Sequence, residues 1–210
     1  RSFHSYLVGI TPGLRLAGVA SRSAETRARI EAERGCRAYG SFEDVLADPS
    51  VDLVVLATPN STHADLAVRA LEAGKNVVTD KIMCLTAADC DRMIAAAGRT
   101  GLFLGVFQNR RWDGDFLTLR AALSDGLLGD LRWLEMAWQG FGPWGGWRSQ
   151  AAMGGGKYYD LGAHLVDQMV LLFPDPVESV YCRMHHDFPG MDVESSALLV
   201  VSFEIGSDDT

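Results

Sequence analysis

The feature that most constrains the fold is a regular alternation of short apolar runs with charged, helix-like segments between residues 14 and 106. The apolar runs at residues 14–20, 52–58, 76–79 and 102–106 predict strands, and the segments 24–34, 62–73 and 86–99 between them predict helices. Residues 41–48 predict a further short helix that begins with a capping box at Ser41. The run DLVVLAT at 52–58 is typical of a strand that a parallel sheet buries on both faces. Together these patterns predict an α/β, Rossmann-type, doubly wound parallel sheet over residues 1–109.

The pattern changes near residue 110. Residues 116–124 and 159–173 predict helices, and the alternating segment LRWLEMAWQ at 131–139 predicts an antiparallel strand with one solvent-facing side. Residues 177–184 and 195–205 predict two more strands. We therefore expect a second, α+β domain over residues 110–210, with a mainly antiparallel sheet that is incomplete.

Composition argues against several classes of protein. The chain is 48% hydrophobic and 22% charged, which is typical of a soluble globular protein. A net charge of −8 without any basic run argues against nucleic-acid binding, and no apolar stretch is long enough to span a membrane. Four scattered cysteines with no CxxC pair favour reduced thiols in the cytoplasm, and we interpret His185-His186-Asp187 as a solvated turn, so no metal site is expected.

The glycine fingerprint of dinucleotide-binding folds, a GxGxxG turn after the first strand, is absent, because Gly9 and Gly13 do not have its spacing. Residues 14–20 would form the second strand of a complete domain. We therefore expect the first strand and its glycine loop upstream of Arg1, with residues 1–10 as the helix that follows the loop. A start without Met and an end just after an apolar run agree with a piece of a longer protein. The pattern alone equally allows an α/β domain that binds no nucleotide.

Two polar clusters follow predicted strands, where open α/β sheets bind their ligands. The first is Thr58-Pro59-Asn60, just before a predicted helix that contains His63. Its alternative interpretation is an ordinary turn and helix N-cap. The second is Asp80-Lys81, whose lysine could be desolvated and act as an electrophile or in proton transfer, although a surface ion pair is the alternative.

The third cluster is GGGKYYDLGAH at residues 154–164. Glycines allow a ligand to approach the backbone closely, and Asp160 and His164 are four residues apart, so both project from one face of a helix. A histidine beside a carboxylate suits acid–base catalysis near neutral pH. The alternative is a helix-capping aspartate and a core histidine.

In this order and spacing, the segments ATPNSTH, AGKNVVTDK, NRRWDGDF, WR and GGGKYYDLGAHLVDQ resemble the Gfo/Idh/MocA oxidoreductases, named after glucose–fructose oxidoreductase, inositol dehydrogenase and rhizopine catabolism. The resemblance covers nearly the whole chain and is closest to the NADP-dependent scyllo-inositol dehydrogenase-like subgroup. It implies hydride transfer between a nicotinamide and a hydroxyl-bearing carbon of a sugar or cyclic polyol. It also implies that residues 110–210 bind substrate and form a homo-oligomer, with the apolar strands after Val177 as a candidate interface.

The resemblance assigns roles position by position. Lys81 corresponds to the lysine that touches the nicotinamide ribose and the reacting oxygen, His164 to the proton-transfer residue, and Asp160 to the acid that helps to place the substrate. The residues implied near the cofactor are Thr58, Pro59, Asn60, His63, Asp80, Lys81, Asn109, Trp147 and Arg148.

Two departures from the family pattern lie on either side of Lys81 in the chain. Asp80 stands where the family usually has Glu, and Ile82 where it usually has a proline that is sometimes cis. Because a non-proline cis peptide costs about 2.5–4 kcal/mol, we expect the Lys81–Ile82 bond to be trans, with a shifted ammonium and weaker catalysis. Ile82 thus favours the alternative of a non-catalytic NAD(P)-binding sensor or regulator. A glycosidase with tightly held nicotinamide and an interaction module without cofactor are further alternatives.

The cofactor can be argued from the end of the strand at residues 14–20. NAD-binding domains place an acid there to hold the ribose 2′-hydroxyl, whereas this chain has Ser21 and Arg22. A serine hydroxyl and a guanidinium suit a 2′-phosphate. We therefore expect NADP(H) to be preferred, with NAD(H) possible.

Overall fold

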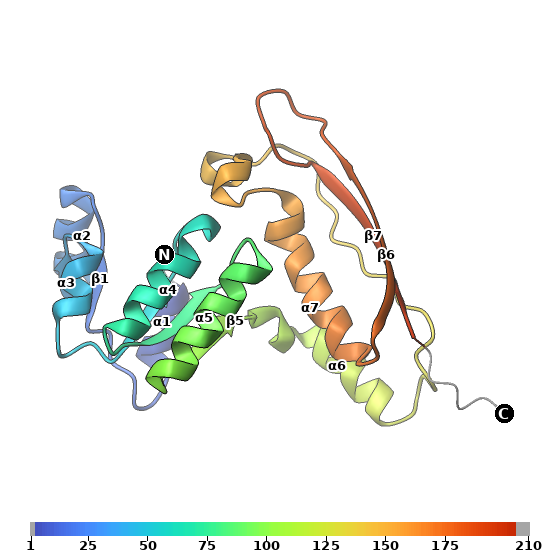
Figure 1. Ribbon diagram of the computed structural model, residues 1–210, viewed down its shortest axis with the longest axis horizontal. Helices are drawn as coiled ribbons and strands as arrows, with labels where there is room; N and C mark the ends of the chain where they lie inside the picture. The colour runs from blue at the N-terminus through green and yellow to red at the C-terminus, as the bar shows by residue number, and fades with distance from the viewer. Residues whose placement is uncertain (1–2, 205–210) are drawn as a thin grey trace. The chain divides into compact units, whose positions relative to one another are not determined.

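The protein is described here by a computed structural model, which describes residues 3–204 (Figure 1). The chain divides into two compact units, which we call unit 1 (Arg1–Thr58 and Thr62–Val106) and unit 2 (Pro59–Ser61 and Phe107–Thr210). Residues 1–2 of the first predicted helix and residue 205 of the last predicted strand lie outside the described residues. None of the described helices combines the length and the apolar character needed to cross a membrane.

Unit 1 alternates helices and strands in the predicted order, with one further strand, β2, that was not predicted. Its helices are α1 (Phe3–Ile10), α2 (Ala24–Arg34), α3 (Phe42–Ala47), α4 (His63–Glu72) and α5 (Ala87–Thr100). Its strands are β1 (Gly18–Ala20), β2 (Arg37–Tyr39), β3 (Leu53–Leu56) and β4 (Asn76–Asp80), and β5 (Leu104–Phe107) extends across its boundary.

The sheet of unit 1 is parallel and Rossmann-type, as predicted, but it forms two pieces. β1 pairs with β2 in parallel, and a second sheet has the order β3-β4-β5, with β3 parallel to β4. A complete doubly wound domain has six strands in the order 3-2-1-4-5-6. In that order β1 and β2 correspond to the second and third strands of the complete domain, and β3, β4 and β5 correspond to its fourth, fifth and sixth strands. β1 and β3 are therefore the strands that would flank the first strand, and no described strand occupies its place. This accounts for two sheets in place of a continuous one.

The strand predicted at residues 14–20 is shorter than its apolar run, because β1 begins only at Gly18. Its partner β2 has three residues, and the pairing runs from Gly18 opposite Arg37 to Ala20 opposite Tyr39. A strand requires a hydrogen-bonded neighbour, so an apolar run beyond the reach of β2 does not become a strand by itself.

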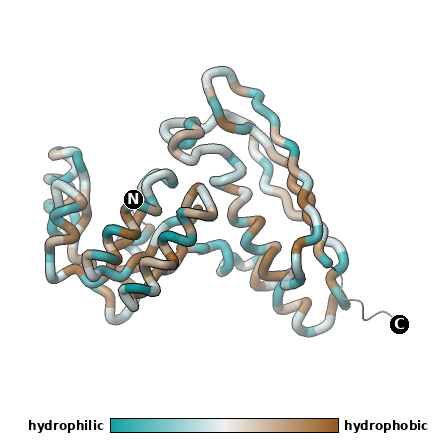
Figure 2. The backbone as a smooth tube through the Cα atoms, in the orientation of Figure 1, coloured by the Kyte–Doolittle hydropathy of each residue, from teal (hydrophilic) through white to brown (hydrophobic). Residues whose placement is uncertain are grey.

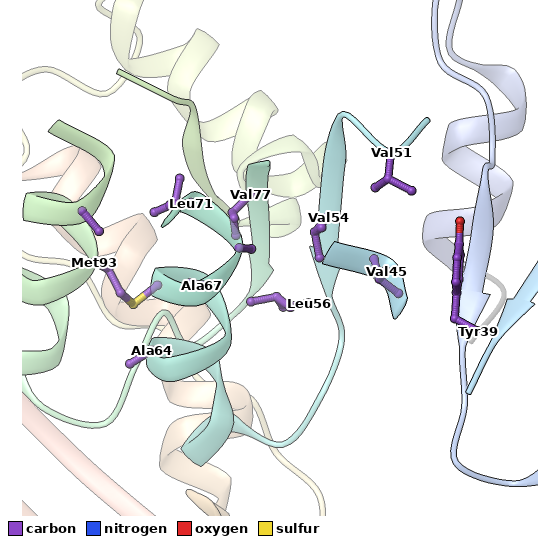
Figure 3. Close-up of a cluster of buried hydrophobic side chains, with 12 residues drawn as sticks. Tyr39, Val45, Val51, Val54, Leu56, Ala64, Ala67, Leu71, Val77 and Met93 are labelled. Atoms are coloured by element: carbon purple, nitrogen blue, oxygen red, sulfur yellow. The ribbon is translucent and has the colours of Figure 1, made fainter. Parts of the chain in front are cut away.

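The core of unit 1 lies between α4, α5 and the strands β3 and β4 (Figure 3). Leu71 on α4, Val77 on β4 and Met93 on α5 are each 0% exposed. Ala67 and Ala70 are equally buried, and their small side chains allow helix α4 to approach its neighbours closely. Burial of this kind contributes about 1.5–3 kcal/mol for each large aliphatic side chain.

Asp48, which follows α3, ties four groups together. Its carboxylate accepts hydrogen bonds from the Ser50 hydroxyl at 2.7 Å, the Ser50 N–H at 2.8 Å, the Tyr39 hydroxyl at 2.8 Å and Arg37 Nη1 at 2.7 Å. The bonds from Ser50, followed by that from Tyr39, hold the pKa of the Asp48 carboxyl well below its ordinary value. The buried Lys75 ammonium donates to the Asp48 carbonyl at 2.8 Å, which joins α3 to the start of β4.

We expect the substitution Asp48→Asn to destabilise the protein at neutral pH and to have less effect in acid. A carboxyl whose pKa is lowered by folding stabilises the fold above its unfolded pKa of about 3.9, and this stabilisation is lost as the pH falls below that value. Urea midpoints of wild type and variant, measured from pH 7 to pH 3, should converge toward acid. A constant difference would contradict the expectation.

Unit 2 contains α6 (Gly114–Ser124), α7 (Ala163–Leu172) and the antiparallel strands β6 (Val177–His185) and β7 (Ser196–Phe203). A mainly antiparallel sheet was predicted and is confirmed. The strand predicted at residues 131–139 is wrong, since these residues form no regular structure. Trp133 is 74% exposed and Trp138 42% exposed, and no described strand pairs with this segment. Alternation suits a strand but does not provide the hydrogen-bonded neighbour that a strand needs.

Candidate active site

The segment after β3 is held in place by His63, the first residue of α4. The His63 side chain is completely buried, with Nδ1 2.7 Å from the Ile82 carbonyl oxygen and Nε2 3.0 Å from the Thr58 carbonyl oxygen. The Thr58 and Thr62 hydroxyls also contact each other at 2.7 Å. The ring of His63 therefore connects the segment that follows β3 to the segment that follows β4.

Lys81 lies directly after β4 and is partly buried. Its neighbour Asp80 contacts His4 on α1, with 2.8 Å between Asp80 Oδ1 and His4 Nε2. The Lys81–Ile82 peptide is cis, so the expectation of a trans bond is wrong. That expectation rested on the intrinsic preference of an isolated peptide, which takes no account of tertiary contacts.

The segment after β1 is organised by Arg27 of α2. Arg27 Nη1 donates to the Ser21 carbonyl at 2.8 Å and to the Arg22 carbonyl at 3.0 Å, and the Ser21 N–H donates to the Tyr39 carbonyl at 3.0 Å. Arg22 is exposed, and Ser23 caps the N-terminus of α2 by accepting from the Thr26 N–H. Ser21 and Arg22 therefore lie at a helix N-terminus, which favours the binding of an anion.

In unit 2, the first and third sequence clusters meet. Asn60 Nδ2 donates to the Gly154 carbonyl at 2.7 Å, and the Ser61 hydroxyl lies 3.8 Å from the sulfur of Met153. Asn60 is 4% exposed. This buried hydrogen bond from the Asn60 side-chain amide holds the glycine segment against Pro59–Ser61, although Asn60 and Gly154 are 94 positions apart in the chain.

Asp160 is joined to the segment that contains Trp147 and Arg148. Arg148 Nε donates to Asp160 Oδ2 at 3.2 Å, and the Arg148 guanidinium lies 4.7 Å from the centre of the Trp147 ring. The Gly156 N–H donates to the Arg148 carbonyl at 2.9 Å, so the backbone holds the same two segments together. Three of the predicted site residues therefore form one connected group.

Asp160 and His164 lie on a helix that differs from the prediction in its first turn. Tyr158–Gly162 is a π-helix (η5), which continues as α7 from Ala163. His164 is 6% exposed, and its ring lies 6.2 Å from that of Trp138. Single π turns within α-helices are frequent at functional sites. Burial raises the pKa of Tyr158, so this hydroxyl remains protonated.

Asn109 begins the short helix η2 (Asn109–Trp112). On either side of it, Gln108 Oε1 and Arg110 Nε are buried and have no hydrogen-bond partner among the described residues. Buried polar atoms are nearly always paired, so such atoms suit the polar groups of a ligand. This observation fits a polar cofactor or substrate near Asn109.

Glu194 is a residue that the sequence analysis missed. It is 9% exposed and accepts a hydrogen bond from the Tyr158 N–H at 2.5 Å, at the start of the helix that contains Asp160. A Cβ atom on Gly156 would lie 2.4 Å from Glu194 Oε1. Only the tertiary fold brings residue 194 to this helix, and a lone Glu before a strand gives no signal in the sequence. His4 was missed for the same reason, since its partner Asp80 lies 76 positions later in the chain.

Among the described residues, no group of three or more His, Cys, Asp or Glu side chains is placed to hold a metal ion.

The predicted site residues are divided between the two units of the chain. Ser21, Arg22, Thr58, His63, Asp80 and Lys81 belong to unit 1, and Pro59, Asn60, Asn109, Trp147, Arg148, Asp160 and His164 belong to unit 2.

The chain is similar in sequence to proteins that are named as oxidoreductases. The chain is 42% identical over 179 residues to an uncharacterized oxidoreductase, YdgJ of Escherichia coli, covering 84% of this chain and 51% of that protein. It is 36% identical over 137 residues to the scyllo-inositol 2-dehydrogenase (NADP(+)) IolW of Bacillus subtilis, covering 64% of this chain and 38% of that protein. The chain thus spans about half or less of the length of these curated relatives.

A crystal structure of an NAD-binding protein from Listeria innocua has the same fold. It superposes with a TM-score of 0.87 at 37% identity and covers 97% of this chain and 60% of its own. Residues 1–108 match the model of the oxidoreductase family with an NAD-binding Rossmann fold, and residues 116–207 match that of the GFO/IDH/MocA C-terminal domain. The chain therefore belongs to the Gfo/Idh/MocA family of oxidoreductases.

Proposed function

We propose that this chain forms part of an NAD(P)-dependent dehydrogenase that acts on a hydroxyl-bearing carbon of a sugar or cyclic polyol. Residues 1–109 bind the dinucleotide, and residues 110–210 bind the substrate. The observation that most supports this proposal is the bond from Asn60 to Gly154, which joins the polar segment after β3 to the glycine segment before Asp160 and His164. Both residues of this hydrogen bond belong to unit 2.

The residues present fit a dinucleotide and a polar substrate. Bound nicotinamide supplies the hydride donor or acceptor of such a reaction. His164 accepts the hydroxyl proton during oxidation, and the Lys81 ammonium stabilises the negative charge that develops on the same oxygen. Asp160, held by Arg148, orients the substrate. The remaining residues proposed to contact the cofactor are Thr58, Pro59, Asn60, Asp80, Asn109, Trp147 and Arg148.

The first test is a titration of the complete protein with NADPH and NADH, followed by nicotinamide fluorescence and then a turnover screen against sugars and cyclic polyols. Binding with turnover is the expected result. Binding without turnover on any substrate would favour the alternative, an NAD(P)-binding sensor or regulator. Failure to bind either nucleotide would remove the oxidoreductase proposal.

NADP(H) is the preferred cofactor in this proposal, and replacing Arg22 with alanine tests that preference. A hydrogen bond to a charged group contributes about 1.5–3 kcal/mol, so Arg22→Ala should weaken NADPH binding by roughly tenfold or more. NADH lacks the 2′-phosphate, so its Kd should not change. Arg29→Ala is the matched control, because Arg29 is also exposed but lies within α2. This variant should alter the Kd of neither nucleotide. An equal loss of affinity for both nucleotides would contradict the 2′-phosphate assignment.

The sheet of β6 and β7 exposes apolar side chains. β6 and β7 carry hydrophobic residues along their length (Figure 2), and Val180, Leu198 and Val200 are 61%, 56% and 43% exposed. We propose that this sheet is covered by a second copy of the chain in a homo-oligomer. The described cysteines form no disulfide, which agrees with the proposed cytoplasmic location.

A further inference from the structure

The residue that the structure sets apart most clearly is His63. Its side chain is 0% exposed, which makes direct contact with a bound molecule impossible in this conformation. Both ring nitrogens face backbone carbonyl oxygens, Nδ1 that of Ile82 at 2.7 Å and Nε2 that of Thr58 at 3.0 Å. The resemblance had placed His63 beside the cofactor, and its burial indicates a different role.

The two carbonyls belong to the segments that carry proposed site residues. Thr58 follows β3, and Ile82 is the residue after Lys81. Carbonyl oxygens can only accept, so a neutral ring donates to one of them at a time and a doubly protonated ring donates to both. The contact from Nδ1 to the Ile82 carbonyl oxygen, 2.7 Å, is shorter than that from Nε2 to the Thr58 carbonyl oxygen, 3.0 Å. The Ile82 carbonyl belongs to the residue that directly follows Lys81.

We propose that His63 is a positioning residue, whose Nδ1–H holds the Ile82 carbonyl and thereby sets the place of the Lys81 side chain. His63 is the first residue of α4, and the buried Ala67 and Leu71 lie on the same face of α4 one and two turns later. His63 thus connects a rigid core helix to the lysine of the proposed reaction. The catalytic part of this inference rests on the proposed dehydrogenase function.

A pair of substitutions separates the two hydrogen bonds of the ring. In His63→Asn the side-chain amide nitrogen takes nearly the position of Nδ1 and can still donate to Ile82 O. In His63→Gln the amide nitrogen takes nearly the position of Nε2 and can donate only toward Thr58 O. Both variants remove the aromatic ring from the core, so the general loss of packing is similar in both.

The variants are compared in the complete protein by kcat, by KM for NADPH and by hydrogen–deuterium exchange of the peptide covering residues 79–84. His63→Gln should lose about 100-fold in kcat, as expected when a reacting group is misplaced by about 1 Å, with a smaller change in KM. His63→Asn should retain clearly more kcat than His63→Gln. Exchange in the peptide 79–84 should be faster in His63→Gln than in His63→Asn.

Leu71→Ala is the matched control, because it destabilises the same helix through a side chain that is also 0% exposed but lies far along α4 from Lys81. It should keep kcat near the wild-type value at temperatures where circular dichroism shows all proteins folded. Equal kcat and equal exchange in the two His63 variants would overturn the proposal. If the wild type shows no turnover, the proposed function fails, and the exchange comparison still decides whether His63 holds residues 81–82.

Discussion

Replacing His164 with alanine is expected to lower kcat by about 10²- to 10⁴-fold, the range over which positioned proton-transfer groups act. His164 is 6% exposed, on the first turn of α7, which follows the π turn that carries Asp160. Lys81→Ala should lower kcat by about 10²- to 10³-fold in the same assay, because it removes the charge that stabilises the reacting oxygen. Initial rates of the complete protein with NADP(H) and an active sugar or polyol measure both effects.

His186→Ala is the control for this experiment, since His186 is exposed and lies outside the proposed site. Its kcat should not change, and fluorescence titration should show that His164→Ala still binds NADPH. Turnover within a few-fold of wild type in either His164→Ala or Lys81→Ala would remove that residue from the proposed chemistry.

The second large effect is expected at Gly155, in the segment before Asp160. A Cβ atom at this position would lie 2.4 Å from the Arg148 carbonyl oxygen and 2.9 Å from that of Gln150. These are backbone atoms that cannot rotate away, and the Gly155 N–H also donates to the Gln150 carbonyl at 3.0 Å. Gly155→Ala should therefore cost about 3 kcal/mol of stability and also lower kcat by displacing Arg148 from Asp160.

Gly98→Ala provides a control of opposite sign. Gly98 lies on the exposed face of α5, and a Cβ there would meet nothing within 4 Å. Alanine in a helix interior is favoured over glycine by about 0.5–1 kcal/mol, so this variant should be slightly more stable than wild type. Urea denaturation of both variants makes the comparison, and a Gly155→Ala protein as stable as wild type would show that the segment can move to accommodate a side chain.

Capping residues in the sequence predicted where several helices of unit 1 begin and end. Ser41 forms the predicted capping box with Asp44, Thr86 caps α5, and α2 ends at Gly35, which has a φ of +58° that favours glycine. Each of these features depends on residues a few positions apart. The unbroken apolar run at residues 52–58 likewise predicted β3, because a strand that a parallel sheet covers on both faces is apolar along its length.

Features that depend on a distant partner were predicted poorly. Residues 131–139 alternate like a strand, yet no described strand pairs with them. The Lys81–Ile82 peptide is cis although local preference favours trans. His63 Nδ1 meets the carbonyl oxygen of Ile82, 19 positions later in the chain, and no local pattern predicts this contact.

Residue type and spacing along the chain were enough to predict the family, the order of helices and strands in unit 1 apart from β2, and the segments that carry the proposed chemistry. How those segments are held depends instead on contacts between residues that are far apart in the chain. The bond from Asn60 to Gly154 joins residues 94 positions apart, and Glu194 binds Tyr158 across 36 positions. Contacts over such separations arise when the core packs, since burial leaves each polar group to find its partner among whichever residues the fold brings near.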